Sequence, residues 1–258
     1  MKFLTAFINY RSWILGGVGL CIGGGMATAA PEPDPRHGWE MLARFSASAA
    51  ALDFEAEETP DSPEKQLGRA AVYLGKYPQT PQNVDRAAEL LESLIQQPER
   101  SEYQAAGYYL LARISHIFRE GDEAKAALYY RQLRQKFPEN RLADNAAVKL
   151  ALLQLHELPP DVDAATVAAT IAQLERPIRK STLSDFHQVV ASYLLEKEDL
   201  KLAFVHLTAA RNLGVATGKN RANLQVQVGR VGTLIHEYQI ALGAFEQFVE
   251  DYPSDGRN

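Results

Sequence analysis

Cysteine is almost absent from this sequence: Cys21 is the only one in 258 residues. It lies in an N-terminal stretch that we expect to be cleaved off, and the mature chain could then form neither a disulfide nor a thiolate metal site. The histidines are scattered singly, without the i, i+4 spacing of a His-Glu-x-x-His zinc site. The sequence therefore predicts a fold held by packing alone, with no metal and no cofactor.

The sequence also lacks any run of basic residues. It has 27 lysines and arginines against 32 acidic residues, a net charge of -5 at pH 7. Loss of Lys2 and Arg11 with the N-terminal stretch would leave 25 basic residues and a net charge of -7. Proteins that bind nucleic acid usually need a basic patch or stripe, so we expect no nucleic-acid partner.

No long apolar run is present that would make a comfortable membrane span. The apolar stretch from Trp13 to Ile22 is short and rich in glycine, and it follows Lys2 and Arg11 and precedes Ala27-Thr28-Ala29. This order is typical of a secretory signal peptide cleaved after Ala29. We expect a periplasmic or otherwise exported protein with no integral span after processing, and association with the envelope is compatible with this address.

Two alternatives keep the N-terminal stretch. An uncleaved anchor would leave the same soluble part outside the membrane. A lipoprotein attached through Cys21 is disfavoured, because Leu20 stands where that signal has a small residue.

Strand-like alternation of apolar and polar residues is absent too, whereas helical spacing is common. We predict a signal peptide at residues 1–29, a proline-rich linker at 30–38 and a helical repeat domain at 39–258. The domain would start with one helix, Trp39 to Leu52, and continue with about five hairpins. These hairpins are expected within residues 64–98, 103–138, 141–175, 183–213 and 220–250.

Two of the hairpins share a residue spacing. Small, large, large and proline residues step by four, three and five positions in both: Ala126, Tyr130, Leu133, Pro138, and Ala241, Phe245, Phe248, Pro253. The pattern resembles the tetratricopeptide repeat, and the last unit also has Leu224 and Gly229 at the family's spacings. The resemblance implies an all-α, right-handed solenoid of helical hairpins. Ile114 and the extra loop at Pro159 depart from the pattern.

The phrases RQLRQKFPENRLADNAAVKLALLQL and FEQFVEDYPSDGRN give a narrower resemblance. They are similar to tetratricopeptide-like periplasmic proteins such as the outer-membrane assembly lipoproteins and the Tol-Pal coordinator family. This similarity covers residues 64–253, and it implies a fold and a compartment more strongly than a function.

Catalytic motifs are fragmentary. GVATGKN at residues 214–220 is one residue short of a phosphate loop and has Asn220 where serine or threonine would bind magnesium. Ser62 and Lys65 have the Ser-x-x-Lys spacing of some acyl enzymes, but no companion motif occurs, so we predict that Ser62 is a helix cap. We therefore expect a protein that is not an enzyme.

The leading hypothesis is a non-enzymatic scaffold that binds a peptide or envelope protein in a groove lined by the first helix of each hairpin. The alternatives are a glycan-binding or cell-wall-associated solenoid, or a fragment of a longer cell-envelope protein. The tetratricopeptide register places these residues in the groove: Tyr108, Leu111, Ser115, Phe118, Gln188, Ser192, Leu195, Asn223, Val226 and Arg230.

The last hairpin has an apolar edge. Leu242 and Val249 widen the apolar stripe of the final helix on the side where a further hairpin would dock, and repeat arrays usually cover such an edge. We expect that a second copy, a partner or further sequence covers it. Self-association through this hairpin is one possible result.

Overall fold

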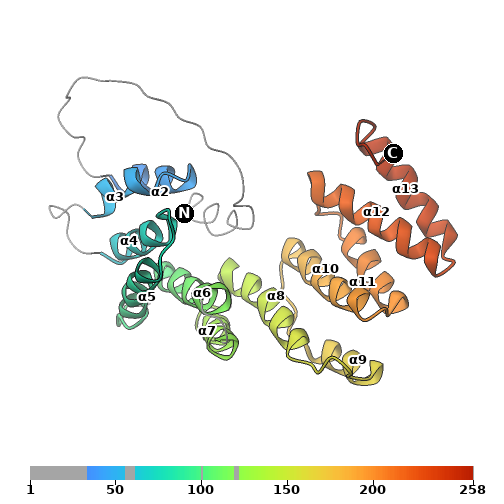
Figure 1. Cartoon of the computed structure of the whole chain (residues 1–258), viewed down its shortest axis with the longest axis horizontal. Helices are drawn as coiled ribbons and strands as arrows, with labels where there is room; N and C mark the ends of the chain where they lie inside the picture. The colour runs from blue at the N-terminus through green and yellow to red at the C-terminus, as the bar shows by residue number, and fades with distance from the viewer. Residues whose placement is uncertain (1–33, 56–61, 100, 119–121, 258) are drawn as a thin grey trace. The chain divides into compact units, whose positions relative to one another are not determined.

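The computed structural model describes residues 34–55, 62–99, 101–118 and 122–257. Within these ranges the regular structure consists of the α-helices α2 to α13, without a strand (Figure 1). None of the described helices is long and apolar enough to span a bilayer. The proposed signal peptide, its cleavage site and Cys21 lie outside the described residues. So does Gly121, which we expect to end the first helix of the hairpin at residues 103–138.

The helices form two compact units, and the boundary falls at Tyr129–Tyr130 inside α7 (Glu123–Lys136). The first unit holds α2 (Pro35–Ala43), α3 (Ala47–Phe54), α4 (Pro63–Gly75), α5 (Pro81–Ile95) and α6 (Glu102–Ile117). The second holds α8 (Arg141–His156), α9 (Ala164–Gln173), α10 (Lys180–Glu196), α11 (Leu200–Asn212), α12 (Gly218–Leu234) and α13 (Tyr238–Asp251).

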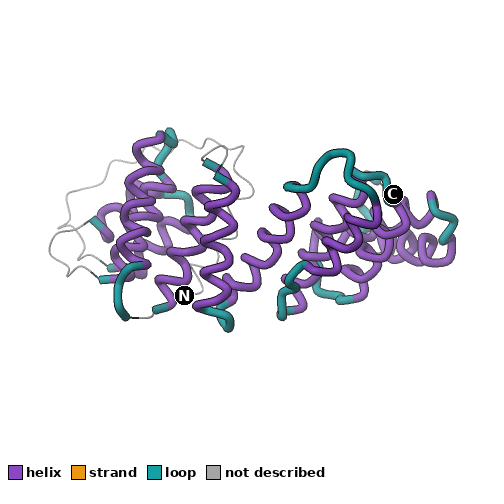
Figure 2. Tube along the Cα trace, turned by 90° about the horizontal axis from the view of Figure 1, so that it is seen from below, coloured by secondary structure: helices purple, strands orange, loops and turns teal. Residues whose placement is uncertain are grey.

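Helices adjacent in sequence pack against each other within each unit, and short loops join them (Figure 2). The pairs are α2 with α3, α4 with α5, α10 with α11, and α12 with α13. The predicted fold class, an all-α array of helical hairpins, is confirmed.

Three hairpins use the same turn. In each, one residue adopts a left-handed conformation with φ between 59° and 67°: Phe45, Glu198 and His236. The next residue donates its N–H to a carbonyl five residues earlier, which closes the first helix in a Schellman motif. Five residues after each left-handed residue comes a fully or almost fully buried alanine: Ala50, Ala203 and Ala241. The turn and the small residue therefore define one repeat register.

The N-terminal helix differs from our prediction. We expected a linker to residue 38 and one helix from Trp39 to Leu52, but α2 begins at Pro35 and the chain breaks at Phe45 before α3. The Asp34 carboxylate accepts the Arg36 N–H at 2.9 Å, and a proline follows the cap, a common way to start a helix. The predicted single helix is thus a hairpin of the repeat type.

Phe54 is the centre of the core of this hairpin. Its ring is fully buried and lies edge-on to Trp39, with ring centroids 4.9 Å apart. Gly38 on α2 and Gly68 on α4 both face the ring, so each helix approaches Phe54 at a residue without a side chain. Such close approach is a specific use of glycine inside a helix.

Ser62 caps the helix α4, as predicted. Its hydroxyl oxygen accepts the Lys65 N–H at 3.1 Å, and Pro63 and Glu64 follow in the first turn. Lys65 itself is buried.

In the second unit, α8 and α9 do not form the tight hairpin that we expected. α8 packs mainly on α10, and α9 makes a smaller contact with α8. A cluster of buried residues joins α8, α9, α10 and α11. It includes Leu155, Ile171, Phe186, Val190 and Leu194. A second cluster joins α10 to α13 and includes Ala191, Phe204, Leu207, Leu224, Val228 and Ala244.

Candidate interaction surface

The predicted groove residues on α6 are mostly buried. Tyr108, Leu111 and Ser115 are at most 3% exposed, whereas Phe118, just after the helix, is 38% exposed. The cause is that α4 and α5 both pack on α6 and that nearly every residue from Gln104 to Ser115 is inside. In this arrangement only Phe118 of the four offers surface to a partner, which corrects the predicted lining of the groove at α6.

The predicted residues of the second unit lie at or near the surface. Ser192 and Arg230 are exposed, and the other four are half-buried: Gln188, Leu195, Asn223 and Val226. They come from α10 and α12, the first helices of two hairpins that share the second core cluster. We call these six residues the first-helix face. That a partner binds there stays a prediction.

The chain's own C-terminal segment reaches the first-helix face. A guanidinium N–H of Arg257 donates to the Asn223 amide oxygen at 2.7 Å, and the same guanidinium lies over the Phe248 ring. The Tyr252 hydroxyl donates to the Gly218 carbonyl at 2.9 Å. A partner that uses Asn223 would therefore have to share it with Arg257 or displace that side chain.

Two histidines meet beside this face. The Nδ1 atoms of His187 on α10 and His206 on α11 are 3.0 Å apart, so one ring donates its N–H to the other and the two rings cannot both be charged in this arrangement. Burial and then the charges of His187 and Arg176 lower the pKa of His206 from 6.5 to about 4. Burial, with Arg176, also lowers the pKa of His187. The pair is neutral at pH 7.

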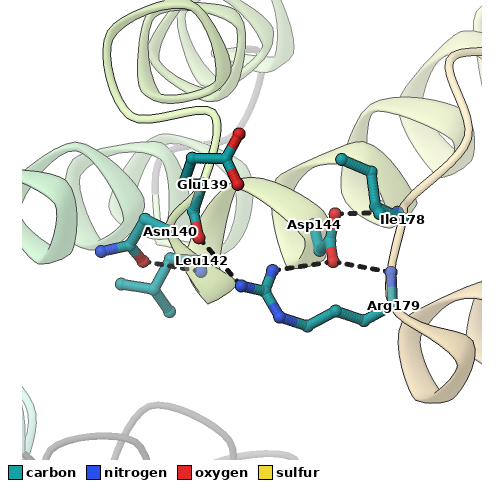
Figure 3. Close-up of polar contacts among 6 residues, drawn as sticks. All are labelled: Glu139, Asn140, Leu142, Asp144, Ile178 and Arg179. Atoms are coloured by element: carbon teal, nitrogen blue, oxygen red, sulfur yellow. Dashed lines mark hydrogen bonds and ion pairs between the residues drawn. The ribbon is translucent and has the colours of Figure 1, made fainter.

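A buried carboxylate fixes the start of α10 to α8 (Figure 3). The two oxygens of Asp144 accept the backbone N–H groups of Ile178 and Arg179, each at 3.0 Å, and the Arg179 guanidinium donates to the same carboxylate at 2.9 Å. Arg179 also donates to the Glu139 carbonyl at 2.8 Å. Burial acts to raise the pKa of Asp144, but these hydrogen bonds outweigh it and lower the pKa.

The Asp144 contacts hold the segment just before α10. The N-cap residue Arg179 makes no side-chain capping bond, and the carboxylate of α8 instead accepts the N–H groups of Ile178 and of Arg179 itself. The segment after α9 thereby returns to a defined point on α8, which aligns α10 and its part of the first-helix face.

We expect Asp144→Asn to lower the free energy of unfolding of the second unit by about 2 kcal/mol. The amide keeps one acceptor oxygen but turns an NH₂ group toward the donors of Ile178 and Arg179. Urea unfolding at pH 7 measures the change. Asp163→Asn is the matched control, because Asp163 is an exposed N-cap where asparagine serves equally well. Equal midpoints for the two variants would contradict the role of Asp144.

The phosphate-loop-like stretch has another use in the structure. The helix α12 begins at Gly218, and both Gly214 and Gly218 have positive φ, so the glycines shape the turn between two hairpins. Across the described residues, no three histidine, cysteine or acidic side chains are grouped so that they could hold a metal ion.

Comparisons with protein-family models, with curated proteins and with solved structures find no significant match to this chain.

Proposed function

We propose that the protein is a non-enzymatic exported scaffold that binds a peptide or an envelope protein through its first-helix face. One observation carries the proposal: six predicted groove residues on α10 and α12 lie at or near the surface of a packed array of hairpins, whereas most of the apolar residues of these helices are buried. Polar and apolar groups alternate over this face, from Ser192 and Leu195 to Val226 and Arg230, which suits an amphipathic peptide.

The rigidity of the hairpins supports binding by a preformed surface. The second core cluster packs α10, α11, α12 and α13 together, and the Asp144 contacts hold the start of α10. A surface on rigid elements loses little conformational entropy when a partner binds. Export is part of the proposal because the N-terminal stretch has the order of charges, apolar run and small residues of a signal peptide.

Position-specific photo-crosslinking tests the proposal. A photoreactive phenylalanine analogue is placed at Ser192 or Arg230 on the first helices, and at Lys201 or Val205 on α11 as controls. All four positions are exposed. We expect an adduct with the same protein from Ser192 and Arg230, and none from the two controls.

Two other results would contradict it. Equal adducts from all four positions would mean that the first-helix face has no special role. Retention of the chain on peptidoglycan beads, without a protein adduct, would favour the glycan alternative. N-terminal sequencing of the chain from the envelope would test export separately, because an intact Met1 contradicts cleavage after Ala29.

A further inference from the structure

The helix α13 carries an exposed apolar stripe on one side. Tyr238, Leu242 and Val249 are 58%, 54% and 50% exposed, and their spacing of four and seven residues puts them on one helical face. We call these three residues the α13 edge. It lies next to the buried side of the helix, which contains Ala241, Ala244 and Phe248.

The repeat register shows what such a position does elsewhere in the unit. Ala203 and Ala241 occupy the same place after the hairpin turn, so Phe204 on α11 is the counterpart of Leu242. Phe204 is only 7% exposed, because its ring packs against Gly232 of α12 and joins the core cluster with Leu224 and Val228. No described helix covers Leu242 in this way.

The charges beside the α13 edge indicate what kind of helix could pack against it. Glu246 lies between Leu242 and Val249 on the same side and is exposed, and Glu250 follows one turn later. α13 has no lysine or arginine. By contrast, α12, which covers the equivalent side of α11, has Lys219, Arg221 and Arg230 and no acidic residue. A helix of α12-like chemistry thus complements both the apolar stripe and its acidic border.

A second copy of this chain fits the edge poorly. Two α13 helices packed around a two-fold axis would bring their acidic borders, at Glu246 and Glu250, close to each other. Head-to-tail packing would need an apolar face on α2, the first helix of the first hairpin. In the repeat register, however, the α2 counterparts of Val228 and Val231 are His37 and Glu40, which are polar.

We propose that the α13 edge is a docking site for an amphipathic helix of another protein, with basic residues flanking its apolar stripe. The helix would continue the array by taking the place that α12 takes on α11. The site is separate from the first-helix face, so it extends the proposed function to a second surface.

A synthetic peptide with the sequence of residues 216–236, labelled with fluorescein, serves as the probe. Fluorescence anisotropy measures its binding to the purified full chain at low ionic strength. We expect saturable binding that Leu242→Glu weakens about tenfold or more, because a carboxylate would be buried against the apolar stripe. Val205→Glu is the control, since it makes the same kind of change at an exposed residue of α11 and should leave binding unchanged.

A charge exchange tests the border. Glu246→Lys should weaken binding of the basic peptide several-fold, and it should strengthen binding of a peptide in which the three basic residues are replaced by glutamate. Far-UV circular dichroism checks that each variant is folded, and Val249→Glu replaces Leu242→Glu if that variant is not. Crosslinking from Ser192 and Arg230 should be unaffected by Leu242→Glu, so the two proposals can fail separately.

Three results would overturn the proposal. Peptide binding that Leu242→Glu and Val249→Glu leave unchanged would place the site elsewhere. If Glu246→Lys does not alter the binding of the peptide, the proposal that the partner helix carries basic residues is wrong. Self-association of the wild type in sedimentation velocity over the micromolar range, abolished by Leu242→Glu, would assign the edge to a second copy.

Discussion

Gly68→Ala is expected to lower the free energy of unfolding of the first unit by about 3 kcal/mol. A Cβ atom at Gly68 would lie 2.2 Å from Cδ1 and 2.4 Å from Cε1 of Phe54, far inside van der Waals contact. The ring cannot turn away easily, because it is fully buried between this glycine, Gly38 and Trp39. Urea unfolding followed by far-UV circular dichroism measures the loss.

Gly243→Ala is the matched control, with the same methyl group added inside another helix. A Cβ atom at Gly243 would meet nothing within 4 Å, so the better helix propensity of alanine should raise stability by about 0.5–1 kcal/mol. Gly229→Ala should fall between the two, because its Cβ would approach the ring of Phe245, which is only half-buried and can move. Similar urea midpoints for Gly68→Ala and Gly243→Ala would contradict the close packing of the Phe54 ring against Gly68.

Helix positions were the most predictable part of the fold. Apolar spacing, capping residues and prolines mark most helix ends in the sequence, and Arg141 to His156 was predicted with the bounds that α8 has. The first hairpin was missed although its turn is the same as those at Glu198 and His236. Polar residues mark the turns at Glu198 and His236, whereas Phe45 is apolar and continues the helical spacing of Leu42 and Ala49, so the periodicity shows no break there.

The candidate surface was less predictable, because spacing alone does not tell which side of a helix its neighbours cover. The helix α6 is an example, because it is apolar nearly all round from Ala105 to Ala112. Such a composition is typical of a buried helix, and it indicates burial more strongly than the repeat spacing indicates a groove. On α10 and α12 the repeat register predicted positions at or near the surface more successfully. The polar residues Gln188, Ser192, Asn223 and Arg230 interrupt the apolar pattern there.

The histidine pair was missed for a geometric reason. His187 and His206 are 19 residues apart and belong to different helices, so no local motif joins them. Their distances from the turn at Glu198 are similar, and antiparallel helices bring such residues side by side. A search of the sequence for histidines arranged in this way around each turn would have found them.

We expect the second unit to lose about 3 kcal/mol of stability as the pH falls from 7 to 4, because of His206. In the unfolded chain its imidazole binds a proton near pH 6.5, but in the fold burial and the positive charges of His187 and Arg176 lower the pKa to about 4. The unfolded state therefore binds more protons throughout this interval. The stability that the neutral pair provides is fully present above pH 6.5 and is lost below it.

His206→Asn isolates this effect, because the amide can still bond to the His187 Nδ1 but does not titrate. We expect urea midpoints of the variant to change much less between pH 7 and 4.5 than those of the wild type. The lowered pKa of His187 and the pKa of Asp185, which burial raises, both contribute to the remainder. The exposed His156 gives the control: His156→Asn should keep the wild-type slope. Asp144 does not confound the comparison, since its carboxyl pKa lies below 3.8 and its contribution is lost only at lower pH. A His206→Asn profile as steep as that of the wild type would show that another group controls the acid sensitivity.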